Sequence, residues 1–85
     1  MAITIQECSN TNDGCRIAFH PGEDVDMVII YLEKVCDDNG WQAGSADRSV
    51  KERIVLDIKG TTCTEFGSRL SADPQFDFTN CKGCR

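Results

Sequence analysis

Six cysteines in a chain of 85 residues limit the possible folds of this protein more than any other feature. They are spread along most of the chain, at Cys8, Cys15, Cys36, Cys63, Cys81 and Cys84. A domain this short buries only about 60–65% of the surface that its unfolded chain exposes, and its core supplies roughly 3–5 kcal/mol. An even number of cysteines in a short chain is typical of a disulfide framework. We therefore expect a single domain over residues 1–85, held together by three disulfide bonds.

The cysteine content also indicates an oxidising compartment, because cytosolic proteins rarely keep disulfides. We therefore expect a secreted, extracellular protein. Residues 1–7 show neither the basic region nor the apolar stretch of a secretory leader, so we expect a mature form, with a cytosolic protein as the alternative. The longest apolar run, residues 27–32, is far shorter than the about 20 residues that span a bilayer. We expect no transmembrane segment.

The charge of the chain argues against two classes of partner. The formal net charge is −5, and the acidic residues are scattered along the chain. Nucleic acids and anionic membrane surfaces are bound by clustered Lys and Arg side chains. We therefore expect no nucleic-acid partner, and a soluble monomer.

Hydrophobic periodicity predicts the secondary structure. Apolar residues alternate with polar ones in three segments, which we expect to be strands at 15–19, 54–58 and 76–79, and a shorter strand is expected at 41–43. Residues 3–6 alternate in the same way and predict a short N-terminal strand or extended arm.

Two segments carry helix signals. From Val25 to Cys36, apolar residues recur at helical spacing, and Gly40 follows as a stop. Thr62 and Glu65 have the spacing of a capping box for a second helix. The resulting order predicts an α+β fold: a two-layer sandwich of the split βαβ (ferredoxin-like) type, with two helices on one face of an antiparallel four-stranded sheet, plus an N-terminal arm.

This topology predicts which cysteines meet. The two helices would run antiparallel, so Cys36 at the end of the first would lie near Cys63 at the start of the second. The first and last strands would be antiparallel neighbours, which brings both ends of the chain together. Because bridged Cα atoms lie within about 7 Å, we expect the bonds Cys36–Cys63, Cys8–Cys84 and Cys15–Cys81, with the last two open to exchange.

Motifs for catalysis or metal binding are weak in this sequence. Cys81 and Cys84 match the redox pattern C-x-x-C, but no helix follows them to lower a thiol pKa, so a structural role is favoured. The other cysteines are isolated and do not form the second closely spaced pair of a zinc site. His20 stands beside a proline turn, where a strand-end surface position is favoured. We expect no enzymatic activity, no cofactor and no metal.

Three residues are candidates for contacting a partner. Trp41 is the single tryptophan of the chain, and tryptophan is frequent among the residues that dominate protein interfaces. The alternative is that Trp41 closes the open end of the core. Arg48 and Lys51 belong to the basic cluster nearby, for which a solvated loop is the alternative.

The element order, the small size and the cysteines linking helix to helix and terminus to terminus resemble small secreted fungal proteins that share the fold of a virally encoded smut-fungus killer toxin. The resemblance covers roughly residues 15–84 and carries no motif from which functional residues could be transferred. It implies a secreted, cysteine-rich effector with a virulence, toxin-like or antimicrobial role, acting by binding a protein or cell-surface target of a host or rival microbe. The alternative is a secreted inhibitor of an extracellular hydrolase, with residues 44–51 as the inhibitory loop.

Overall fold

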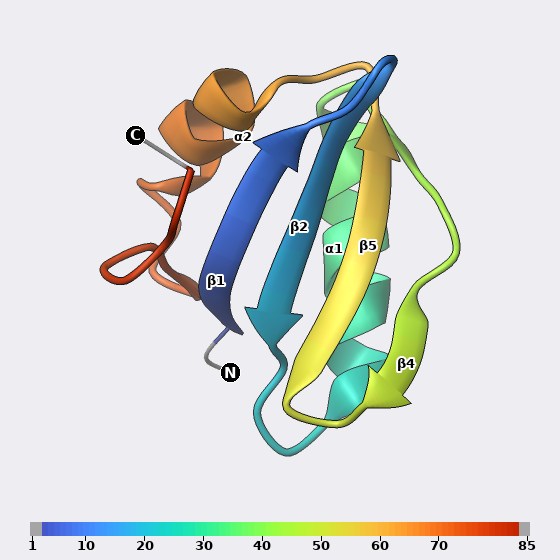
Figure 1. The fold of residues 1–85 in the computed structure, drawn as a ribbon, viewed down its shortest axis with the longest axis vertical. Helices are drawn as coiled ribbons and strands as arrows, with labels where there is room; N and C mark the ends of the chain where they lie inside the picture. Colours follow the sequence, from blue (N-terminus) through green and yellow to red (C-terminus); the bar gives the residue numbers. More distant parts are fainter. Residues whose placement is uncertain (1–2, 84–85) are drawn as a thin grey trace.

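The computed structural model describes residues 3–83 and contains both predicted helices and a sheet (Figure 1). In chain order the elements are β1 (Ile3–Asn10), β2 (Gly14–His20), α1 (Val25–Asp38), β3 (Gln42–Ala43), β4 (Asp47–Val50), β5 (Arg53–Lys59), α2 (Cys63–Leu70) and β6 (Phe76–Asp77). The expected α+β class is confirmed. None of the helices in the described part of the chain is long and apolar enough to span a bilayer.

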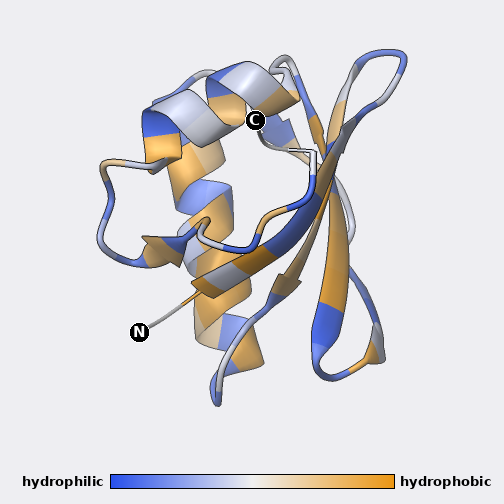
Figure 2. Cartoon of the chain, turned by 60° about the vertical axis from the view of Figure 1, so that its left-hand side comes forward, coloured by the Kyte–Doolittle hydropathy of each residue, from blue (hydrophilic) through white to orange (hydrophobic). Residues whose placement is uncertain are grey.

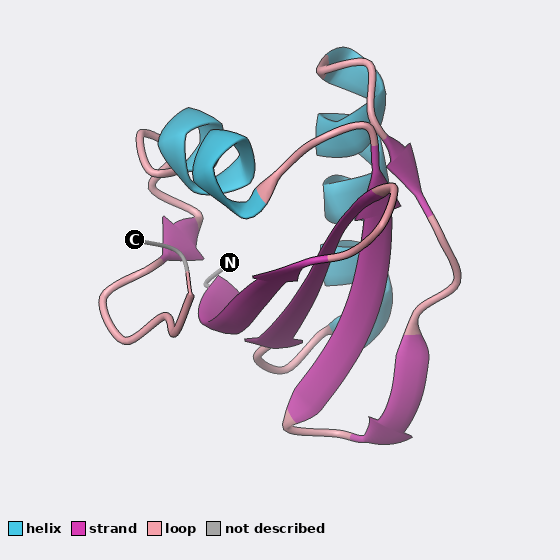
Figure 3. Cartoon of the chain, turned by 45° about the horizontal axis from the view of Figure 1, so that its top comes forward, coloured by secondary structure: helices cyan, strands magenta, loops and turns pink. Residues whose placement is uncertain are grey.

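The sheet is mixed and curled, so the expected antiparallel four-stranded sheet is wrong (Figure 3). The strand order is β3-β5-β2-β1-β6, and β4 also pairs with β5. The strand pairs β1–β2 and β2–β5 are antiparallel, whereas β1 and β6 are parallel. The last strand therefore does not lie beside β2, where the split βαβ topology places it.

The reason lies in the N-terminal segment, which forms a full strand instead of an arm. Residues 9–14 are turn formers, and the amide of Thr11 donates a 2.9 Å hydrogen bond to the carbonyl of Gly14, which closes a hairpin between β1 and β2. Strands joined by a tight turn pair with each other. β1 thus takes the free edge of β2, and β6 is left to pair with the outer edge of β1.

Both helices lie on one side of the sheet (Figure 2). The inward side chains of the central strands pack against the apolar stripes of the helices in one continuous cluster. Phe19, Leu32 and Phe66, from β2, α1 and α2, are 0% exposed at its centre. The opposite face of the sheet is polar, and there Arg16 of β2 holds Asp57 of β5 with a 2.7 Å ion pair.

Each helix begins at a side-chain cap. Asp24 accepts a 3.1 Å hydrogen bond from the amide of Met27 at the start of α1. The hydroxyl of Thr62 accepts a 3.2 Å bond from the amide of Glu65 at the start of α2, which confirms the predicted cap. Such caps satisfy amides that have no partner within the helix.

The three expected disulfide bonds are not formed among the described residues. Cys8, Cys15, Cys36 and Cys63 are all free and buried. The pair Cys36–Cys63 does not form because the sulfur of Cys63 faces Cys8 instead, at 2.8 Å. Cys81 is disulfide-bonded, but none of the four buried cysteines is its partner, so the pair Cys15–Cys81 is also absent.

The remaining expected pair, Cys8–Cys84, involves a residue outside the described part of the chain. The C-terminal segment does return to β1, as expected, because the amide of Cys8 donates a 2.8 Å hydrogen bond to the carbonyl of Lys82. The Cys8 side chain, however, points into the core, where it is 2% exposed. The inserted strand β1 is again the cause, since it carries Cys8 inward.

Candidate functional site

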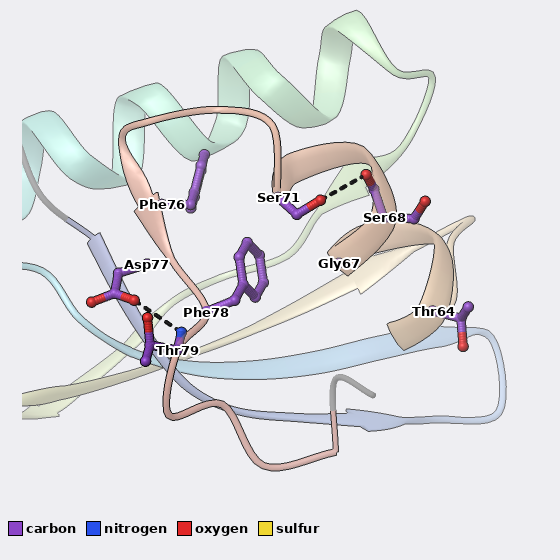
Figure 4. A pocket seen from close by; sticks show the side chains of 8 residues that line it. All are labelled: Thr64, Gly67, Ser68, Ser71, Phe76, Asp77, Phe78 and Thr79. Carbon is purple, nitrogen blue, oxygen red and sulfur yellow. Dashed lines mark hydrogen bonds between the residues drawn. The ribbon is translucent and has the colours of Figure 1, made fainter.

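A pocket of about 680 Å³ lies between α2 and the segment that contains β6 (Figure 4). We call it the α2 pocket. Its lining residues are Thr64, Gly67, Ser68, Ser71, Phe76, Asp77, Phe78 and Thr79. Its volume falls within the about 300–1,000 Å³ that is typical of ligand sites.

One wall of the α2 pocket is the polar side of α2. Thr64, Ser68 and Ser71 stand at helical spacing, and all three are exposed. Among the residues that α2 buries, Phe66 and Leu70 lie on its other side and anchor the helix to the core. The hydroxyl of Ser71 donates a 3.2 Å hydrogen bond to the carbonyl of Ser68 within this wall (Figure 4).

The opposite wall is aromatic. Phe76 is 7% exposed and Phe78 is half-buried, and their ring centroids lie 6.3 Å apart. Phe78 also makes an edge-on contact of 6.1 Å with Phe66 of α2, and Phe76 contacts Tyr31 of α1 at 5.8 Å. These contacts support the wall from the core side, since aromatic pairs at such distances attract one another.

Asp77 is the acidic side chain of the lining. The hydroxyl of Thr79 and its amide, which lies 2.9 Å from the carboxylate, both donate hydrogen bonds to Asp77. These bonds lower the pKa of Asp77, the hydroxyl more than the amide. The carboxylate therefore stays ionised at neutral pH and is poorly suited to act as a general acid.

The lining of the α2 pocket offers polar and apolar groups to a ligand. Its hydroxyl groups can donate or accept hydrogen bonds, and its rings offer apolar surface. Among the described residues, this lining includes one carboxylate and no imidazole, amine or thiol. The lining can hold a segment that carries an apolar side chain flanked by polar groups.

The structure places Trp41 in the core rather than on the surface. Its side chain is 6% exposed, and its ring lies 6.0 Å from that of Phe66. The amide of Trp41 donates a 2.8 Å hydrogen bond to the carbonyl of Cys36, which holds the residue against the end of α1. With so little exposed surface, Trp41 closes the end of the core and offers little to a partner.

Arg48 and Lys51 are exposed and lie at the β4 end of the molecule, away from α2 (Figure 1). Arg48 makes a 2.6 Å ion pair with Asp26 of α1. Lys51 follows β4 in the turn to β5. The structure therefore does not bring the three predicted partner-contacting residues together, nor does it bring them to the α2 pocket.

Four cysteines meet at one end of the core. The single S–H of Cys8 is shared between two acceptors, the sulfur of Cys63 at 2.8 Å and that of Cys15. The bond from Cys8 lowers the pKa of Cys15 and raises that of Cys8 itself. Burial raises the pKa of Cys36 to about 11 and also raises that of Cys63. Cys15 is therefore the most acidic thiol of this cluster.

Residues 3–83 contain no group of three or more His, Cys, Asp or Glu side chains arranged to hold a metal ion. His20 lies at the end of β2, as its turn sequence suggests, and its Nδ1 accepts a 3.0 Å hydrogen bond from the amide of Gly22. His20 thus stabilises the turn that leads toward α1.

Comparisons with known proteins identify no relatives: no family model matches the chain, and neither a curated protein nor a solved structure matches it.

Sequence reasoning missed the α2 pocket, although two signals for it are present. Thr64, Ser68 and Ser71 form a hydroxyl-bearing stripe at spacings of four and three residues, on the side of the helix opposite its apolar residues. Phe76 and Phe78 were expected on one face of a strand. Both rings line the pocket, although β6 ends at Asp77.

Proposed function

We propose that the protein is a secreted, non-enzymatic effector or toxin-like protein that acts by binding a target of a host or a competing microbe. The α2 pocket is the binding site, and its occupant is a short segment of a target protein. The observation that carries this proposal is the lining of the pocket, which joins exposed hydroxyl-bearing residues to the half-buried ring of Phe78.

Secretion is supported by the chain's cysteines. Four buried thiols in a short chain, two of them with sulfur atoms 2.8 Å apart, suit an oxidising compartment, where small domains use disulfides to compensate for a small core. The killer-toxin-like character of the fold stays part of this proposal. It rests on the small size of the chain and on the two helices packed on one side of the sheet, because the expected link from helix to helix through Cys36 and Cys63 is not formed.

An inhibitor of an extracellular hydrolase is the second candidate function, and the edge formed by β4 favours it. β4 pairs with β5 on one side only and lies at the margin of the sheet. Val50, in this strand, is 52% exposed. Inhibitors that occupy a hydrolase cleft can present such an extended edge segment.

The test is binding of the fluorescently labelled protein to intact plant and fungal cells. We expect saturable binding that unlabelled protein displaces and that protease treatment of the cells removes. Replacing Ser68 with Trp fills the α2 pocket and should weaken binding by about tenfold or more, which corresponds to roughly 1.4 kcal/mol.

The matched control is Lys34→Trp, which adds the same side chain at an exposed position of α1 outside the pocket. This variant should bind like the unmodified protein. Equal binding by the Ser68→Trp variant would show that the α2 pocket is not the site. Tight inhibition of one hydrolase in a panel, lost on replacing Val50 with Asp and kept in the Ser68→Trp variant, would establish the inhibitor function instead.

A further inference from the structure

Four cysteines from four different elements converge at one end of the core. Cys8 lies in β1, Cys15 in β2, Cys36 in the last turn of α1 and Cys63 at the first position of α2. None of them is more than 4% exposed. The fold thus collects at one place thiols that are separated by up to 55 residues in sequence.

The contacts within this cluster are unequal. The sulfur atoms of Cys8 and Cys63 are 2.8 Å apart, under an ångström more than the about 2.05 Å of a disulfide bond. Assigning this pair first leaves Cys15 and Cys36, which belong to the same buried core cluster. The charge of Cys15 also acts on Cys36.

The register of the β1–β2 hairpin disfavours a bond between Cys8 and Cys15, although their side chains are hydrogen-bonded. Cys8 lies opposite Ile17, and Cys15 lies opposite Asn10, so the two cysteines are diagonal neighbours. Diagonal positions are typically about 7–8 Å apart, which is beyond most bridged Cα pairs.

We propose that in an oxidising compartment Cys8 forms a disulfide bond with Cys63, and Cys15 forms one with Cys36. The first bond would join β1 to α2, and the second would join β2 to α1. Each helix would then be tied to its own strand, and the helix that forms a wall of the α2 pocket would be fixed to the sheet at its first residue.

The oxidation balances with a small disulfide such as oxidised glutathione as the oxidant. A protein thiolate attacks it, forming a mixed disulfide and releasing one glutathione thiol. The second protein cysteine then displaces the other glutathione thiol, so each bridge transfers two electrons and two protons to glutathione. Since all four thiols are buried, the exchange takes place while the chain folds.

The test is disulfide mapping after refolding with a mixture of reduced and oxidised glutathione. Trypsin leaves Cys8 and Cys15 on one peptide, so a second protease that cleaves before Asp13 is needed to separate them. We expect the Cys8 peptide linked to the Cys63 peptide, and the Cys15 peptide linked to the Cys36 peptide. A Cys36–Cys63 or Cys8–Cys15 link, or four unlinked peptides, would overturn the proposal.

Single substitutions provide an independent readout. Cys63→Ala should free Cys8, and Cys36→Ala should free Cys15, each seen as one new alkylation label after denaturation. A label on any other cysteine contradicts the pairing. If either variant fails to fold, the mapping of the unmodified chain still decides the question.

Discussion

Tyr31 is the single tyrosine of the chain, and its hydroxyl donates a hydrogen bond to the carboxylate of Asp73. This bond, followed by burial, raises the pKa of Tyr31 to about 12. We predict that the absorbance change of tyrosine ionisation has its midpoint near pH 12 in the folded protein, instead of near the ordinary value of 10. In the Asp73→Ala variant the midpoint should fall toward 10; an unchanged midpoint would contradict the assignment.

The same pKa shift has a consequence for stability. The pKa of Tyr31 is higher in the folded than in the unfolded state, so the neutral hydroxyl contributes stability that is fully present below about pH 10 and is lost as the pH rises toward 12. At pH 7, Tyr31→Phe should lower the free energy of unfolding by about 1 kcal/mol. Urea titrations at pH 7 and pH 12 check this, because the difference between the two proteins should shrink at the higher pH.

Gly14 lies where β2 passes close to β5. A Cβ atom at this position would be 1.9 Å from the carbonyl oxygen of Ile58, which is a backbone atom. We predict that Gly14→Ala lowers the free energy of unfolding by about 1–3 kcal/mol, as overpacking does. Gly44→Ala is the control, because a Cβ atom there would lie 3.3 Å from the carbonyl oxygen of Asp57. This variant should lose less free energy of unfolding than Gly14→Ala. Equal losses in a urea titration would contradict the close approach of β2 and β5.

At the scale of elements, α2 is a short helix of eight residues that depends on its cap. Thr62→Ala removes the acceptor for the amide of Glu65 and should lower the free energy of unfolding by about 1 kcal/mol. Thr62→Ser keeps a hydroxyl and should be close to neutral. Chemical denaturation of both variants checks this prediction, and an equal loss in both would assign the effect to the methyl group instead.

Both helices and β5 could be predicted from the sequence because their periodicity is local. The full length of β1 could not. The side chains of Ile3 and Ile5 both point into the core, but the register of β1 shifts between Ile5 and Glu7. After this shift the next side chain that points into the core is that of Cys8. This bulge breaks the alternation that marks a strand.

The partner of β6 could not be predicted either, since pairing between distant strands is set by which edge is free in the folded chain. Once β1 covers the edge of β2, a parallel position beside Ile3 and Thr4 is the one that β6 takes. The position of β1 beside β2 also explains why the expected disulfide bonds are not formed, because it carries Cys8 into the core.

We expect the stability of the whole protein to depend on the redox state of its buried cysteines. The two proposed bridges close loops between residues far apart in sequence, and each should contribute about 2–4 kcal/mol. The oxidised protein should therefore unfold at a clearly higher denaturant concentration than the reduced protein, as followed by the fluorescence of Trp41. Coincident unfolding curves would mean that the cysteines contribute little to stability.

A thiol count on the protein recovered from the medium of a secreting host, denatured without reductant, tests directly whether the buried cysteines are bridged. We predict that none of Cys8, Cys15, Cys36 and Cys63 reacts with an alkylating reagent until the protein is reduced. Modification of all four in the unreduced, denatured protein would contradict the claim that these buried cysteines serve to bridge the helices to the sheet.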